Sequence, residues 1–96
     1  MDFTKVIISL KEGKCVRRSC WGDKDMFIVK QKPSIIEEVV IPKMQSLPES
    51  AKYKILNNKN KSIYYKDQLL IIDNCGTAYS WNPNVEDIFA EDWIVI

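Results

Sequence analysis

The side chains that could bind or transform a ligand are cationic, aromatic and acidic residues gathered in three short segments. The first segment is RRSCWGDKDMF, residues 17–27. Its arginines could pair with phosphate and its aromatic rings could stack on a nucleobase, so it could bind a nucleotide. The alternative is a hairpin whose tryptophan covers the edge of the core, and the spacing alone favours this alternative. The candidate residues are Arg17, Arg18, Trp21, Met26 and Phe27.

The second segment is AYSWNPN, residues 78–84. Tyr79 and Trp81 are two residues apart, which places them on the same side of a strand. Asn82 follows in an Asn-Pro turn, and its amide could both donate to and accept from a ligand. A core tryptophan and a turn asparagine explain the same pattern, and they are again favoured.

The third segment is acidic, with Glu86, Asp87, Glu91 and Asp92 close together. Two carboxylates could serve as an acid and a base. A short helix with acidic ends explains them more simply, because an acid such as Asp87 is favoured in the first turn. We therefore expect these residues to be structural or ligand-contacting, and we expect no catalytic residue.

The sequence has none of the phosphate-binding, metalloprotease or nucleophile-elbow motifs. It has no histidine, so Cys15, Cys20 and Cys75 lack the partner of a Cys–His nucleophile. A zinc site would need cysteine and carboxylates alone. We therefore expect no enzymatic activity, no metal and no cofactor. The odd cysteine count without a CxxC pair indicates reduced, partly buried thiols.

Composition limits the function classes further. The chain has 96 residues, of which 46% are hydrophobic and 28% charged, and this predicts one globular domain over residues 1–96. Burial is modest at this size, so oligomerisation would add stability. A net charge of +1 argues against binding to DNA or RNA polymers. Without a spanning apolar run or a basic leader, we expect a cytoplasmic protein that does not bind membranes.

The first elements form a helix followed by a hairpin. The stripe of Phe3, Val6, Ile7 and Leu10 predicts a helix over 2–12, with Asp2 as N-cap and Gly13 after its end. Strands are predicted over 14–20 and 26–31, joined by the turn WGDKD.

The rest of the chain is predicted as strands and two helices. SIIEEVVIP (34–42) indicates a strand stopped by proline, and LPESAKYKILNNKN (47–60) a helix with Ala51, Ile55 and Leu56 facing inward. SIYYKDQLLIID (62–73) gives the strongest strand signal, and its chain returns as a second hairpin. A short helix over 84–90 and a strand over 93–96 follow. The predicted class is α+β, a small antiparallel β-sheet with short helices packed on it.

Two long segments resemble a known family. LKEGKCVRRSCWGDKDMFI (10–28) and DNCGTAYSWNPNVEDIFAEDWIVI (73–96) resemble the phage-encoded Thoeris anti-defence family of the second type. The resemblance covers nearly the whole chain, is firm at the two ends and is looser over 31–60. AEDW, residues 90–93, is its most specific part.

This resemblance implies a specific function. Such proteins bind and sequester, without cleaving it, a cyclic ADP-ribose isomer of the glycocyclic type, which TIR-domain Thoeris enzymes make from NAD. They are homo-oligomers, typically tetramers, with ligand pockets at protomer interfaces. Some members also bind cyclic oligonucleotide signals at a separate site. The resemblance thus implies a phage protein that acts in the cytoplasm of the infected bacterial host.

The resemblance also assigns roles to the candidate residues. Trp21 and Phe27 would stack on the base, and Arg17 or Arg18 would meet phosphate. The second hairpin and the helix after it would line the pocket with Trp81, Asn82 and Asp87, and Met26, Tyr79 and Asp92 complete the candidate set. For Trp93 we expect a structural role, in which it fixes the closing strand onto the sheet.

Three other functions remain open on the residues alone. The chain could be a protein–protein module that inhibits a host enzyme, with the aromatic residues as interface anchors. It could be an enzyme that degrades the signal, which the missing histidine argues against. It could bind single-stranded nucleic acid by stacking, but this requires a basic groove that the net charge does not indicate.

Overall fold

The computed structural model describes all residues from Met1 to Ile96, and these form two compact units. Unit 1 consists of Met1–Gln31 and Asp67–Ile96, and unit 2 consists of Lys32–Lys66. The elements of unit 1 are α1 (Phe3–Lys11), β1 (Val16–Arg18), β2 (Phe27–Gln31), β5 (Gln68–Ile72), β6 (Ala78–Ser80), α3 (Val85–Phe89) and β7 (Trp93–Val95). None of the helices of the chain has the length and apolar composition needed to cross a membrane.

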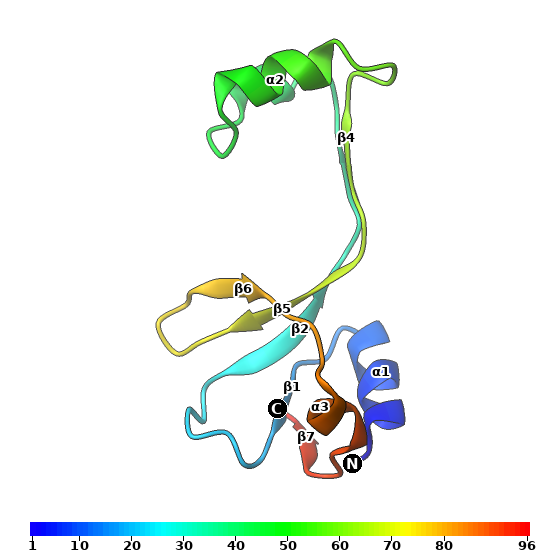
Figure 1. The fold of residues 1–96 in the computed structure, drawn as a ribbon, viewed down its shortest axis with the longest axis vertical. Coiled ribbons are helices and arrows are strands. Elements are labelled where there is room, and N and C mark those ends of the chain that lie inside the picture. The colour runs from blue at the N-terminus through cyan, green and yellow to red at the C-terminus, as the bar shows by residue number, and fades with distance from the viewer. The chain divides into compact units, whose positions relative to one another are not determined.

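The five strands of unit 1 form one antiparallel sheet in the order β6-β5-β2-β1-β7 (Figure 1). The two predicted hairpins are present as the β1–β2 and β5–β6 pairs. The predicted closing strand is also present, since β7 pairs with β1 and so holds the last residues of the chain in the sheet. With its helices, this sheet confirms the predicted α+β class.

Helix α1 forms where the apolar stripe predicts it. The Asp2 carboxylate accepts a hydrogen bond from the Lys5 backbone N–H at 3.1 Å, and Gly13 follows the helix with a φ of +82°. This φ is in the left-handed region, which glycine adopts without a steric penalty. Val6 and Leu10 are buried, and α1 packs against β1, β2, β7 and α3 (Figure 1).

Trp93 lies at the centre of the core of unit 1, where 1% of its surface is exposed. It packs with the buried residues Val6, Leu10, Val16 and Ile28. Three further aromatic rings surround it: the centroid distances to Trp93 are 5.8 Å for Phe3, 5.7 Å for Trp21 and 6.0 Å for Trp81. The Trp93 indole N–H donates to the Asp87 carbonyl at 2.9 Å, so its one polar group is satisfied. The expected structural role of Trp93 is confirmed.

Alternation along the strands gives the sheet two distinct faces. Val16, Arg18, Ile28 and Trp93 share the face that packs against α1, because they are cross-strand partners or two residues apart. The intervening residues point to the opposite face. These are Arg17, Phe27, Val29, Leu70, Ile72 and Ile94.

Unit 2 has a small buried interior. Its elements are β3 (Ser34–Ile36), the 3₁₀-helix η1 (Ile41–Lys43), α2 (Glu49–Leu56) and β4 (Ile63–Tyr65), with β3 and β4 paired as an antiparallel ribbon. Its only buried residues are Ile41 and Lys52. A two-stranded ribbon with so little burial has little stability of its own.

Two strand predictions are wrong in and next to unit 2. The strand predicted over 34–42 ends at Ile36, and the chain turns into η1, where Pro42 cannot donate to a strand ladder. The single strand predicted over 62–73 is divided into β4 and β5, which belong to different sheets. Their partner strands β3 and β2 are separated by Lys32 and Pro33, and proline interrupts strand pairing.

Helix α2 is present, and Ala51, Ile55 and Leu56 lie on its inward side as predicted, although they are only half-buried. The pattern missed Lys52, which lies on the same side and is 7% exposed. The Lys52 ammonium donates to the Pro42 carbonyl and to the Glu49 carboxylate, both at 3.1 Å. These bonds satisfy the charge while the aliphatic stem is covered, so a lysine can occupy a position that the pattern assigns to an apolar residue.

Replacing Trp93 by alanine should destabilise the protein by about 3–5 kcal/mol, because it removes the ring on which three others pack. Val95→Ala, on the same strand but 45% exposed, is the matched control and should change stability by less than about 1 kcal/mol. Urea unfolding followed by circular dichroism measures both. Equal losses for the two variants would contradict the central role of Trp93.

Candidate functional site

One end of the sheet brings together many of the candidate residues. The β1–β2 loop, the segment from Trp81 to α3 and the α3–β7 turn all meet there around Trp93. Trp21 and Trp81 each contact Trp93 edge-on, at interplanar angles of 77° and 81°. Both are half-buried, so part of each indole surface remains available to a ligand.

Arg18 is held by two carboxylates. Its Nε lies 2.9 Å from Asp92 Oδ1, and its Nη1 lies 3.3 Å from Asp87 Oδ1. The three side chains come from β1, the start of α3 and the turn before β7, so the ion pairs join segments far apart in sequence. The charge of Arg18 is therefore already compensated within the chain.

Asp87 and Asp92 are each fixed by further hydrogen bonds. Asp87 forms a capping box with Asn84, in which each side chain accepts from the other residue's backbone N–H. Asp92 accepts from the Cys20 backbone N–H at 3.3 Å as well as from Arg18. The hydrogen bond from Arg18 is the main reason that the pKa of the Asp92 carboxyl falls from 3.8 to about 2. Both acids thus hold Arg18 and the backbone around it in place.

Arg17 differs from Arg18 in the sheet face that it occupies, in its burial and in its lack of a counter-ion. It points to the opposite face of the sheet and is 6% exposed. Its Nη2 donates to the carbonyls of Trp21 at 2.8 Å and Asp23 at 3.2 Å. No carboxylate pairs with it, and its buried Nε has no hydrogen-bond partner. A buried charge without a counter-ion is destabilising. An anion at this site would therefore compensate the charge of Arg17 and could accept a hydrogen bond from its Nε.

The loop over Arg17 is tied to the neighbouring hairpin. The Asp23 carboxylate accepts from the backbone N–H groups of Asp25 at 3.0 Å and of Asn74 at 3.2 Å. The Trp21 ring contacts the core around Trp93, while its carbonyl contacts Arg17 on the other face. The loop therefore connects the two faces of the sheet at this end.

The remaining candidates are more scattered. Phe27 is half-buried and shares the face of Arg17, and Met26 precedes it in the chain. Tyr79, on the edge strand β6, is 56% exposed, and Asn82 is exposed. One chain therefore gathers Arg18, Trp21, Trp81, Asp87 and Asp92 around the Trp93 end of the sheet, whereas Arg17 and Phe27 face the other way.

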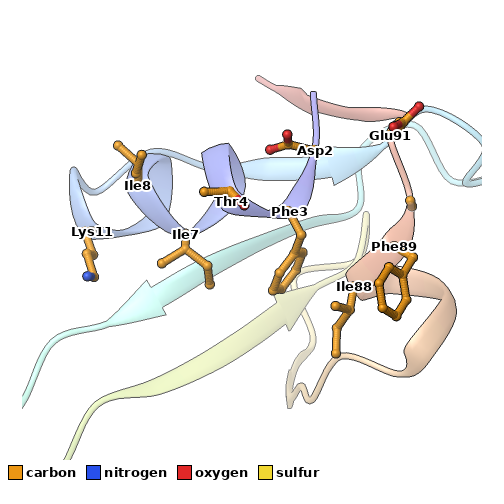
Figure 2. Close-up of a pocket in the computed structure, with 10 residues that line it drawn as sticks. Asp2, Phe3, Thr4, Ile7, Ile8, Lys11, Ile88, Phe89 and Glu91 are labelled. Atoms are coloured by element: carbon orange, nitrogen blue, oxygen red, sulfur yellow. The ribbon is translucent and has the colours of Figure 1, made fainter.

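The structure also has an apolar groove that the sequence patterns did not reveal. This open groove between α1 and α3 has a volume of about 680 Å³, and none of the ten candidate residues lines it (Figure 2). Ile7, which the predicted stripe placed inward, is 37% exposed and lines this groove. The sequence signal that could have indicated the groove is the run Val6, Ile7 and Ile8 in α1. Three consecutive apolar residues are more than one buried stripe of a helix requires, so one of them must face outward.

No group of three or more histidine, cysteine, aspartate or glutamate side chains is arranged to hold a metal ion. The three cysteines are free thiols, as predicted, but Cys20 and Cys75 are exposed and only Cys15 is partly buried. Because β1 is short, Cys20 falls in the exposed loop that follows it.

The family model of the Thoeris anti-defense 2-like (Tad2-like) domain matches residues 1–96, which is the whole chain. No curated protein matches the sequence.

Asp92→Asn should destabilise the fold at neutral pH and have little effect near pH 2. The folded-state pKa of Asp92 is lowered from 3.8 to about 2, so its carboxylate stabilises the folded state above pH 3.8. This contribution is lost as the pH falls from 3.8 to about 2. Urea unfolding of both proteins at steps down to about pH 2 measures it. Glu86→Gln, exposed and unpaired, is the control, and a pH-independent effect of Asp92→Asn would contradict the ion pair.

Proposed function

This chain belongs to the Thoeris anti-defense 2-like family, and from that premise we propose that it binds and sequesters, without cleaving it, a cyclic ADP-ribose isomer of the glycocyclic type. Membership of the family assigns it a role in counteracting Thoeris defence. In our proposal the ligand is the signal that TIR-domain Thoeris enzymes make, and its capture keeps the signal from its effector. The protein acts in the cytoplasm of the infected bacterial host.

The observation that carries the proposal is the uncompensated guanidinium of Arg17 behind the Trp21 loop. A cyclic ADP-ribose isomer has an adenine base, two riboses and a pyrophosphate. Its pyrophosphate would supply the negative charge and the hydrogen-bond acceptors that Arg17 lacks, because guanidinium and phosphate groups pair in a bidentate way. Arg17 currently donates to two loop carbonyls, so ligand entry would require a shift of the loop.

The other candidates have the chemistry that the rest of this ligand requires. The half-buried rings of Trp21 and Trp81 offer faces for stacking. The exposed Asn82 amide offers both a donor and an acceptor to ribose hydroxyls. Arg18 is engaged with Asp87 and Asp92, so we assign it to holding the pocket wall. Binding of this kind requires neither a nucleophile nor a metal.

We also propose that the protein functions as a homo-oligomer, a tetramer, with ligand pockets at the protomer interfaces. The support is the division of the candidates between the two sheet faces, with Arg17 and Phe27 on one and Trp81 near the other. A pocket that uses both sets would need residues from more than one protomer.

A separate site for cyclic oligonucleotide signals belongs to the same proposal. The segment that fits it is unit 2, in which seven lysines accompany three glutamates and in which Tyr53 and Tyr64 are 72% and 59% exposed. Cations and exposed rings suit a ligand with several phosphates and bases.

The test is calorimetric titration with cyclic ADP-ribose isomers, followed by heat denaturation and chromatography of the released ligand. We expect a Kd below about 1 μM and recovery of the unaltered isomer. A chemically altered product would show that the protein is an enzyme and would overturn sequestration. If none of the isomers binds, the proposed ligand is wrong.

The same titration with Arg17→Met tests the residue that carries the proposal. Methionine keeps the apolar volume but removes the buried charge, so we expect a folded protein whose Kd is about 10- to 100-fold higher. Lys24→Met, an exposed cation on the same loop, is the matched control and should bind as the wild type does. Unchanged affinity in folded Arg17→Met would refute the role of Arg17.

A further inference from the structure

The groove between α1 and α3 has the features of a docking surface (Figure 2). Its walls carry apolar side chains that the chain leaves exposed: Ile7, Ile8, Ile88 and Phe89. Phe89 is 79% exposed, although Asp87, two residues earlier in α3, is buried. A contiguous exposed apolar surface of this kind marks an interaction site, because its solvation is unfavourable.

The charges around the groove are arranged by sign. Asp2 and Glu91 lie at the end of the groove near the start of α1, and Lys11 lies at the other end (Figure 2). The length of α1 separates them by roughly 13 Å, at about 1.5 Å per residue. None of these three side chains forms an ion pair within the chain. The groove therefore has one acidic end, one basic end and an apolar middle.

We propose that the α1–α3 groove binds the same groove of a second copy of this chain about a two-fold axis. A two-fold axis across the middle of α1 makes the two helices antiparallel. The Lys11 side chain of each copy then meets the acidic end of the other, so every charge faces its opposite. A parallel arrangement would instead place like charges together. The charge pattern thus selects a second copy in one orientation.

The apolar residues fit the same arrangement. Ile7 and Ile8 lie in the middle of α1, close to the axis, so they would contact their counterparts. Phe89 projects from α3 and would enter the groove of the other copy as an aromatic anchor, a residue type that dominates interface energetics. Acidic and basic groups at the rim would fix the orientation, since rim charges contribute more to specificity than to affinity.

This inference rests on the homo-oligomer part of the proposed function and identifies one of its interfaces. It does not depend on the ligand, because none of the ten candidate ligand residues lines the groove. Sedimentation velocity of the full chain therefore tests it separately from the titrations.

The main variant is Phe89→Asp, which should raise the self-association Kd at this interface at least about tenfold. In a tetramer this would yield dimers. Val85→Asp is the matched control, because Val85 is 70% exposed on the same helix but does not line the groove. Both positions are exposed, so circular dichroism should show an unchanged fold.

Charge exchange tests the orientation. Lys11→Glu and Glu91→Lys should each weaken association, whereas the double variant should restore part of it, because the exchanged charges at 11 and 91 again face their opposites while Asp2 is unchanged. Restoration supports the two-fold arrangement. A double variant weaker than either single variant would overturn it.

The outcomes separate the two proposals. A wild-type monomer at about 100 μM would overturn this inference and the oligomeric part of the proposed function. An oligomer that Phe89→Asp leaves intact would overturn only this interface. A monomer that binds a different protein through Phe89 would replace the second copy as the occupant. Dissociation by Phe89→Asp supports the interface even if no cyclic ADP-ribose isomer binds.

Discussion

The burial of Trp93 is the interaction on which the rest of unit 1 depends. Its ring is in contact with aromatic residues from α1, from the β1–β2 loop and from the segment after β6, and its indole N–H bonds to α3. β7 is only three residues long, so backbone pairing alone would hold it weakly. Packing on Trp93 thus joins segments distant in sequence and sets the positions of Trp21, Trp81 and Asp87.

The two adjacent arginines show how strand geometry divides similar residues between different roles. Arg17 and Arg18 are neighbours in β1, so their side chains point to opposite faces. Arg18 is compensated by Asp87 and Asp92 and supports the structure at the Trp93 end. Arg17 bonds only to backbone carbonyls and retains a buried N–H without an acceptor. Arg17 is therefore the arginine that we propose pairs with the pyrophosphate of the ligand.

Local signals in the sequence predicted most of unit 1. The Asp2 cap, Gly13, the Asn74–Gly76 turn and the Asn84 cap each act within a few residues, so their effects can be read from the sequence.

The division of 62–73 into β4 and β5 was not predictable in the same way, because it depends on which strand lies opposite each half. Burial of Lys52 also depends on a distant acceptor, the Pro42 carbonyl. Among the candidate site residues, five lie together near Trp93, but no local pattern in the sequence distinguishes the paired Arg18 from the unpaired Arg17.

Phosphorus NMR of a cyclic ADP-ribose isomer in the presence of the protein tests the central claim most directly, because it observes the pyrophosphate itself. We expect both phosphorus resonances to shift on addition of the wild-type protein. With Arg17→Met at the same concentration the shifts should be smaller, because binding is weaker and the guanidinium no longer contacts the pyrophosphate. After denaturation of either protein the resonances should return to their free positions without any new signal. New phosphorus resonances after denaturation would show cleavage. Resonances that do not shift with the wild-type protein, or shift equally with Arg17→Met, would contradict binding of the pyrophosphate at Arg17.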